Sequence, residues 1–420
     1  MSNKIGMFQK IESLLKNKVT FNLFYIGIIK FINILSKYIL LSYLVRSFGE
    51  ENYGIVTWVD SFIQYFLILI NFGFDMYVAK YIIENKEDKS KLNTIISTII
   101  TIKTGLFFLS FLILSLFSFV EGISKYIDFM YFMLLMGIGE VLFPFWYFQG
   151  IEKMKPIALV TLISKGLLVV LTIVLIKRPE QILLYISLLV LTNIVWGALG
   201  FFFMKKESDF KFIAVSFKTI LLYLKEGYLF FLGRFSTLFL NFGTIFLIGY
   251  FCSKNLVAGF DIASKIIFAF VFPFEVIQQA LFPVIVRSKN KLFVQRLILF
   301  TVCSGLIFSS FIYLFSEPIM VFFGGIQMSK YAFLLESLVI LIPVISCSII
   351  IGCCSLVAFG AIKQYNYALV ISCVCYVFGV LVLYILNEIK FMNLLILRIS
   401  IDIIMVLLIL YFSLKKKTLL

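Results

Sequence analysis

The stretch TFNLFYIGIIKFINILSKYILLSYLV, residues 20–45, shows the pattern that decides the fold of this chain. It is long and apolar enough to cross a bilayer, which takes a helix of about 20 residues. Within it lie Lys30, Asn33 and Lys37, spaced so that they share one face of a helix. Because a charge inside a membrane is costly, it usually faces a partner or a water-filled cavity. The stretch therefore predicts a membrane helix with one polar face.

Stretches of the same kind follow along the whole chain of 420 residues, of which 62% are hydrophobic and only 14% charged. Soluble domains are about half apolar, so this composition indicates an all-α integral membrane protein. We predict about twelve transmembrane helices, at approximately residues 20–45, 53–79, 92–119, 127–149, 156–176, 181–204, 222–250, 256–285, 293–315, 331–359, 366–386 and 391–414.

Lysine and arginine residues are distributed unevenly over the predicted connections. With a cytoplasmic N-terminus, the inner segments hold roughly three times as many of them as the outer loops, as the positive-inside rule requires. An even number of spans then places both termini in the cytoplasm. The net charge of +15 is explained by this topology, so we expect the lipid bilayer as a partner and no nucleic acid.

The predicted spans divide into two halves at the cytoplasmic connection around residues 205–218. We expect two pseudo-symmetric six-helix bundles, residues 1–210 and 211–420, around a central cavity. A shift of 205 residues places Tyr53-Gly54 on Ala258-Gly259, and each pair opens an even-numbered span. Transporters built from such repeats bind their substrate near the midplane, where the repeats meet.

Polar side chains at helical spacing follow the first two predicted spans of each half. They are Lys30, Asn33 and Lys37; Asp60, Gln64, Asn71 and Asp75; Arg234, Thr237 and Asn241; and Asp261, Lys265, Glu275 and Gln279. We interpret these stripes as the wall of a hydrated cavity in which Lys30, Lys37, Arg234 and Lys265 bind an anion such as phosphate. The remaining residues of the stripes are candidates for polar lining or for coupling to an ion. The alternative is that the cations only pair with Asp60, Asp75 and Glu275 and so hold helices together.

Sequence motifs of enzymes are missing from the chain. It has no P-loop, no Gly-rich dinucleotide turn, no metal-ligand cluster and no histidine. We therefore expect a transporter that is not an enzyme, has no cofactor or metal, and is driven by a gradient or by the membrane potential.

The segment FPFWYFQGIEKMK, residues 143–155, resembles the P-x-W-x-x-Q-G-x-E-x-M signature of bacterial polysaccharide repeat-unit flippases. These are the O-antigen and capsule translocases of the multidrug/oligosaccharidyl-lipid/polysaccharide exporter superfamily. The residues that carry the resemblance are Pro144, Trp146, Gln149, Gly150 and Glu152. Residues 45–54 and 71–74 are similar to the first outer loop and to the end of the second span in that family.

The resemblance implies a V-shaped, two-bundle, twelve-helix protein of the bacterial inner membrane. Such a protein would flip an undecaprenyl-pyrophosphate-linked oligosaccharide from the cytoplasmic to the outer leaflet by alternating access, for O-antigen, capsule or exopolysaccharide assembly. A polysaccharide polymerase and a chain-length regulator are partners that it suggests. Because the signature motif falls at a cytoplasmic end, we expect it to serve packing or gating and not ligand contact. Pro144, which removes a backbone donor, should bend its span.

Two alternatives on the same fold stay open. One is a flippase for another lipid-linked precursor, such as the peptidoglycan unit. The other is a cation-coupled exporter of drugs or small solutes, against which the cationic stripes argue. A polymerase or ligase of the same pathway would have a large outer loop, and no predicted outer loop is long.

Overall fold

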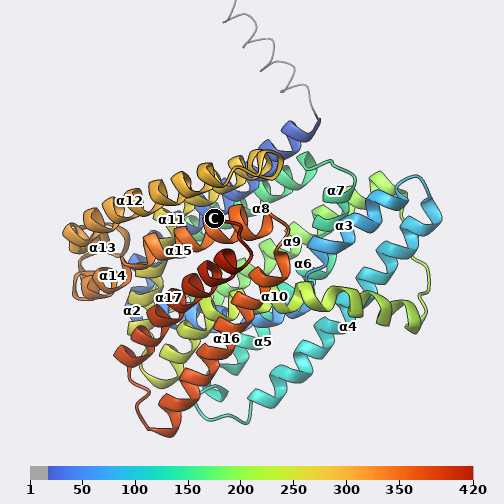
Figure 1. Ribbon diagram of the computed structural model, residues 1–420. Coiled ribbons are helices and arrows are strands. Elements are labelled where there is room, and N and C mark those ends of the chain that lie inside the picture. Colours follow the sequence, from blue (N-terminus) through green and yellow to red (C-terminus); the bar gives the residue numbers. More distant parts are fainter. Residues whose placement is uncertain (1–17, 420) are drawn as a thin grey trace, which may run out of the picture. The chain divides into compact units, whose positions relative to one another are not determined.

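The computed structural model describes residues 18–419 of the chain, with side chains from residue 25 onward except that of Met76. Helices account for nearly all of this part, and no strand occurs in it (Figure 1). A helix satisfies its own backbone donors and acceptors, which hydrocarbon cannot do. The prediction of an all-α membrane protein is therefore confirmed. Lys4, Lys10 and Lys16, which contributed to the expected orientation, lie outside the described residues.

Ten helices in the described part are long and apolar enough to cross a membrane, and a bent pair at 326–338 and 341–357 makes eleven. The first of the ten, residues 25–71, overlaps two predicted spans, and its backbone leaves the helical conformation at Gly49 (φ 75°, ψ 174°). Glycine adopts this conformation at little cost, whereas other residues rarely do. Counted as two spans on either side of Gly49, this helix brings the number to the predicted twelve.

Packing divides the chain into two compact units. The first contains residues up to Leu40 and Ile63–Arg234, and the second contains Leu41–Phe62 and Phe235–Leu420. The expected bundles, residues 1–210 and 211–420, concern which spans are related as repeats. Packing groups residues by their contacts and does not test whether the two halves are repeats. The boundaries 1–210 and 211–420 therefore stay a prediction.

The first unit is built around a core of aromatic and branched side chains that includes Phe74, Ile96, Trp146 and Tyr147. Helices α6 and α8 pack on α9, and α3 packs on α7. The elements of the unit are the two ends of α2 (Lys18–Asn71), then α3 (Phe74–Asn85), α4 (Lys89–Phe117), η1 (Ser124–Tyr126), α5 (Ile127–Leu134), α6 (Met136–Leu142), α7 (Phe145–Gly150), α8 (Lys155–Leu175), α9 (Ile182–Ser208) and the first half of α10 (Phe217–Phe251).

Helices α6 and α9 approach each other closely because glycines face each other where they cross. A Cβ atom added to Gly139 would lie 2.3 Å from the backbone oxygen of Asn193, and one added to Gly197 would lie 2.4 Å from the oxygen of Gly139. Small residues allow such close packing of membrane helices, where dispersion contacts replace the hydrophobic effect. Asn193 lies at this crossing, and Glu140 directly follows Gly139, so the crossing brings these two polar residues near each other.

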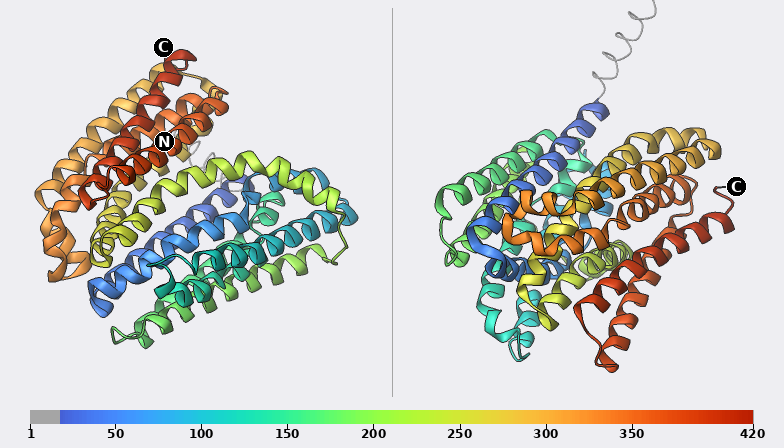
Figure 2. Two further views of the ribbon diagram at one scale, coloured as in Figure 1. Left: turned by 90° about the horizontal axis from the view of Figure 1, so that it is seen from below. Right: turned by 90° about the vertical axis from the view of Figure 1, so that its left-hand side faces the viewer.

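The second unit has its own core, which includes Ile350, Ile351, Leu356 and Ile409. Helices α16 and α17 lie side by side as an antiparallel pair (Figure 2), and α15 packs on α11 and α12. The elements are the middle of α2, the second half of α10, α11 (Lys254–Ser288), α12 (Lys291–Leu314), α13 (Ser316–Gly324), η2 (Ile326–Tyr331), α14 (Ala332–Leu338), α15 (Leu341–Ile349), η3 (Ile350–Val357), α16 (Ile362–Ile385) and α17 (Phe391–Lys415).

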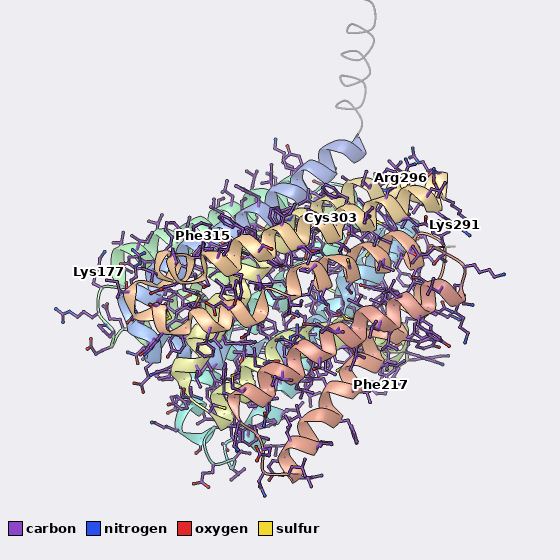
Figure 3. The ribbon with its side chains drawn as sticks, turned by 60° about the vertical axis from the view of Figure 1, so that its left-hand side comes forward. Lys177, Phe217, Lys291, Arg296, Cys303 and Phe315 are labelled. Carbon is purple, nitrogen blue, oxygen red and sulfur yellow. The ribbon has the colours of Figure 1, made fainter. Side chains whose placement is uncertain are left out.

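Helix α12 of the second unit has an exposed apolar face of the kind that contacts lipid. Lys291 and Arg296 lie near one end of the helix, and Phe315 follows its other end (Figure 3). Between them, large apolar side chains such as Leu299 and Ile307 are more than half exposed. An apolar surface of this extent on a soluble protein would be a liability, so this face suits the hydrocarbon, with the charges at the membrane surface.

Candidate functional site

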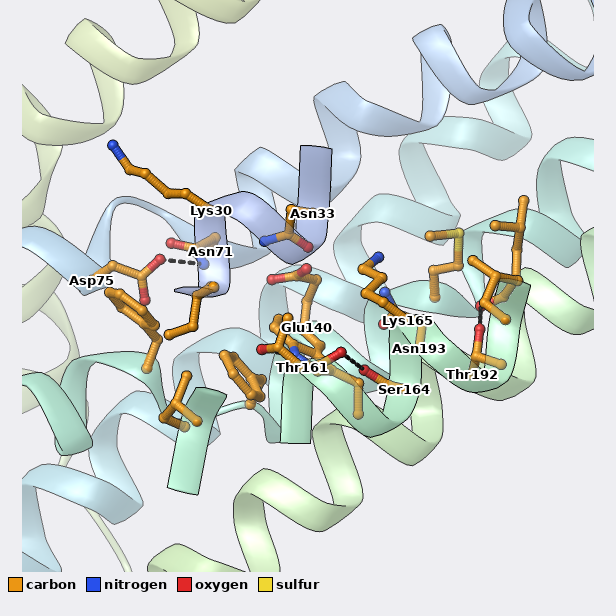
Figure 4. A pocket seen from close by; sticks show the side chains of 18 of the residues that line it. Lys30, Asn33, Asn71, Asp75, Glu140, Thr161, Ser164, Lys165, Thr192 and Asn193 are labelled. Carbon is orange, nitrogen blue, oxygen red and sulfur yellow. Dashed lines mark hydrogen bonds between the residues drawn. The ribbon is translucent and has the colours of Figure 1, made fainter. Parts of the chain in front are cut away.

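The first unit contains an open cavity of about 760 Å³, all of whose lining residues belong to that unit (Figure 4). The charged residues that line it come from five helices: Lys30 on α2, Asp75 on α3, Glu140 on α6, Lys165 on α8 and Arg234 on α10. Three cations thus face two carboxylates. The cavity has a size typical of small-molecule sites, and its charge balance favours an anion.

One end of the cavity is organised around Asp75. Gly73 adopts a left-handed conformation (φ 73°) directly before α3, so Asp75 falls in the first turn of that helix, where the helix dipole favours a carboxylate. Its Oδ2 accepts a hydrogen bond from Nδ2 of Asn71 at 3.1 Å and lies 4.0 Å from Nη1 of Arg234. The Arg234 side chain is 43% exposed, so the guanidinium keeps donors available for a ligand.

The other end of the cavity combines amides and hydroxyls with aromatic rings. Asn193 and Thr161 line it beside Lys165 (Figure 4). The ring of Trp196 stacks on that of Phe143, with the ring planes inclined by 20°, and its Nε1 donates to Oγ1 of Thr161 at 3.4 Å. Amides both donate and accept hydrogen bonds, and an aromatic ring offers an apolar face. This combination matches a sugar ring, which carries hydroxyl groups around apolar C–H faces.

Six predicted site residues meet in this cavity: Lys30, Asn33, Asn71, Asp75, Gln149 and Arg234. Their contact with a ligand stays a prediction. Lys37 also lies on α2 but is exposed and is not part of the lining.

The predicted residues of the second unit have other surroundings. Nζ of Lys265 donates to Oδ2 of Asp261 at 2.5 Å and to the hydroxyl of Tyr53 at 3.0 Å, and the Lys265 side chain is 17% exposed. Oδ1 of Asn241 accepts from Nη2 of Arg398 at 3.2 Å.

The remaining residues of the predicted stripes are not among the lining of the described cavity. Asp60 and Gln64 are half-buried on α2, whereas on α11 Glu275 is half-buried and Gln279 is exposed. A common cavity for all four stripes stays a prediction.

The signature motif lies at the interruption between α6 and α7, where Pro144 stands, and the expected bend of the span stays a prediction. Trp146 and Gly150 are buried in the core of the first unit. Glu152, which follows α7, is exposed and has a left-handed backbone (φ 56°). The expected packing or gating role stays a prediction, but Gln149 lines the cavity, a position that the sequence analysis did not anticipate.

The sequence analysis missed Glu140, Thr161, Asn193 and Trp196 as lining residues. A signal was available for Glu140, which is a carboxylate in the middle of the apolar stretch 127–149. Neutral polar residues such as Asn193 are common enough in membrane helices that their spacing alone does not mark a cavity.

Comparison with proteins of known sequence gives two curated relatives, both named "Putative O-antigen transporter". The one from Shigella dysenteriae is 26% identical over 288 residues, which cover 66% of this chain and 72% of the relative. The one from Escherichia coli (strain K12) is 23% identical over 263 residues, which cover 62% of this chain and 63% of the relative.

Comparison with solved structures gives transporters of one fold. The lipid II flippase MurJ in an inward closed conformation has a TM-score of 0.72 at 16% identity, over 94% of this chain and 87% of that one. An inward-facing MATE family transporter of the MOP superfamily has a TM-score of 0.70 at 14% identity, over 92% and 93% of the two chains. These neighbours are transporters and not enzymes, and at such identities the likeness is one of fold.

The family itself is decided by a match that covers more than half of the chain. Residues 19–289 match the family described as polysaccharide biosynthesis protein, and this range includes the signature motif and every charged residue that lines the cavity. The chain is thus a multi-pass membrane protein that belongs to the polysaccharide biosynthesis protein family.

Proposed function

We propose that this protein flips an undecaprenyl-pyrophosphate-linked oligosaccharide repeat unit from the cytoplasmic to the outer leaflet of the bacterial inner membrane. The cargo would serve O-antigen, capsule or exopolysaccharide assembly. The observation that carries the proposal is the cavity of the first unit, with Lys30 and Arg234 at one end and Asn193 and Trp196 at the other. The names of the two curated relatives agree with it.

The two ends of the cavity suit the two parts of such a cargo. Arginine presents a rigid fork to phosphate oxygens, and lysine adds a mobile point charge, so Lys30 and Arg234 would bind the pyrophosphate. The amides and hydroxyls around Asn193 would bind sugar hydroxyls. The volume of about 760 Å³ holds only part of a long saccharide, so further sugars would extend beyond this cavity.

Translocation would proceed by alternating access, which the division into two compact units supports. The membrane potential can contribute to it. Moving one charge across 100 mV is worth about 2.3 kcal/mol. A pyrophosphate diester with about two negative charges would therefore gain roughly 4–5 kcal/mol on moving outward across an inside-negative membrane.

The test uses a strain that lacks its own repeat-unit flippase and is complemented with this chain. Lys30→Ala combined with Arg234→Ala should abolish surface polysaccharide, measured by gel and immunoblot, at unchanged protein abundance. A matched control is Lys205→Ala combined with Lys225→Ala, which removes two exposed lysines from α9 and α10, neither of which lines the cavity. Wild-type amounts of polysaccharide from the cavity variant would refute the proposal.

A flippase for the peptidoglycan precursor is the second candidate, and the fold likeness to MurJ favours it. Both cargoes carry the same kind of anionic lipid link, so the cavity chemistry does not separate them. Complementation does: growth of a strain depleted of its lipid II flippase would favour the second candidate, and restored surface polysaccharide alone would favour the first.

A further inference from the structure

Lys103 is a buried cation for which the proposed transport site gives no role. It lies on α4, in the predicted span 92–119, which has no other charged residue, and is only 1% exposed. It is not among the residues that line the cavity. A buried charge is stable only with good partners, so the contacts of its Nζ atom should reveal its purpose.

The ammonium group of Lys103 is directed at a backbone carbonyl. Its Nζ donates to the backbone oxygen of Glu140 at 3.0 Å. In a continuous helix that oxygen would accept from the N–H four residues later, but residue 144 is a proline and has no N–H. The preceding carbonyl, that of Gly139, is still satisfied by the N–H of Phe143 at 2.9 Å. The oxygen of Glu140 is therefore the first one that Pro144 deprives of its backbone donor.

The local backbone follows from the same proline. The residue before a proline is pushed out of the helical region, and Phe143 is extended (φ −74°, ψ 117°). Helix α6 accordingly ends at Leu142, and α7 begins at Phe145. Without a substitute donor, this break would leave a carbonyl unsatisfied away from water, which is costly.

We propose that Lys103 is a positioning residue that replaces the backbone donor lost at Pro144 and so stabilises the break between α6 and α7. Cavity-lining residues flank this break: Glu140 before it, and Phe143, Phe145 and Gln149 at and after it. The carboxylates of Asp75 and Glu140 attract the charge of Lys103, whereas burial and the charge of Arg234 oppose it. Lys103 would thus hold one wall of the cavity in place without touching the cargo.

A competing explanation is that Lys103 serves only as a counter-ion for the carboxylates. The two roles predict that different second substitutions change the effect of removing Lys103. If the carbonyl is what matters, Pro144→Ala, which restores the N–H, should reduce the effect of removing Lys103. If only the charge matters, Glu140→Gln should reduce that effect and Pro144→Ala should not.

The experiment is a double-mutant cycle on the purified full chain in detergent, with Tm as the readout. Hydrogen bonds to charged groups are among the stronger ones, so Lys103→Met should lower Tm by on the order of 5 °C in the parent. In the Pro144→Ala background the fall should be much smaller. Lys225→Met, the same exchange at an exposed lysine on α10, should shift Tm equally in both backgrounds. An equal effect of Lys103→Met in both backgrounds overturns the inference.

A second comparison applies if the Pro144→Ala protein does not fold. Lys103→Gln keeps an N–H donor but has no charge, whereas Lys103→Met has neither. Recovery of Tm in the glutamine variant supports donation to the carbonyl. A glutamine variant that is as unstable as the methionine variant overturns it.

The effect on transport rests on the proposed function and is measured separately. At a temperature where the variants are folded and equally abundant, Lys103→Met should lower surface polysaccharide, and Lys103→Gln should restore most of it. The two ideas can fail independently. If the effects of Lys103→Met and Pro144→Ala on Tm are simply additive, the inference about Lys103 is wrong but the flippase proposal stands. If the variant with Lys30→Ala and Arg234→Ala makes normal surface polysaccharide, the flippase proposal is wrong but the double-mutant result on Lys103 stands.

Discussion

Gly139 offers the sharpest test of how the first unit builds its cavity. In Gly139→Ala the new Cβ would lie 2.0 Å from Oδ1 and 2.3 Å from the backbone oxygen of Asn193, whereas ordinary contacts begin at 3.4 Å. The Asn193 side chain can rotate away, but the backbone oxygen cannot. Helices α6 and α9 would therefore have to separate by about 1 Å at their crossing, since packed interiors relax only partly.

Overpacking of this kind costs about 1–3 kcal/mol, and we expect the upper part of that range because the obstacle is backbone. The matched control is Gly166→Ala on α8, where a Cβ would meet nothing within 4 Å. Alanine is the better helix former by about 1 kcal/mol, so this control should be neutral or slightly stabilising. The same chemical change is thus predicted to destabilise the protein at Gly139 but not at Gly166, two helical glycines of one unit.

Both variants would be purified in detergent and unfolded by titration with a denaturing surfactant. Gly139→Ala should unfold at clearly lower surfactant concentration than the parent, and Gly166→Ala should not. Because Glu140 and Asn193 lie beside the crossing and line the cavity, the first variant should also reduce transport. If both variants unfold alike, the close approach of α6 and α9 does not exist as described.

Three further predictions concern other parts of the chain. Arg398 and Asp402 form a buried ion pair of 3.1 Å with side chains 7% and 2% exposed. Arg398→Met alone should therefore destabilise the protein by about 3–5 kcal/mol, and adding Asp402→Leu should recover most of that loss in surfactant unfolding. Tyr53→Phe removes the hydroxyl that donates to Asp261 at 2.6 Å, so it should lower Tm, while phenylalanine at the exposed Tyr228 should not. Asp88 caps α4, and the N–H groups of Lys91 and Ser90 hold the pKa of its carboxyl below its usual range. The cap is therefore complete above the ordinary carboxyl pKa and is lost as the pH falls through the lowered value. Hydrogen-exchange protection in the first turn of α4 should therefore fall at acidic pH as the cap is lost. Asp88→Asn, whose side chain does not titrate, should remove that acid-induced loss of protection.

Features that depend on neighbouring residues could be predicted from the sequence. The apolar lengths of the spans follow from contiguous side chains, and so does the break at Pro144, because a proline acts on its own helix. The placement of Lys30 and Arg234 at a cavity agrees with a general rule, since a cation within a span needs a polar surrounding. These features need no knowledge of which helices meet.

Features that depend on distant residues were decided only by tertiary packing. The sequence shows that Pro144 deprives a carbonyl of its donor, but not that Lys103 on another helix supplies a new one. It shows Gly139 and Gly197, but not that they face each other across α6 and α9. It shows Asp261 and Lys265 on one helix face, but not that Tyr53 on another helix bonds to both. Hydropathy and charge are properties of each segment, whereas the face that a helix buries is chosen by the helices packed against it.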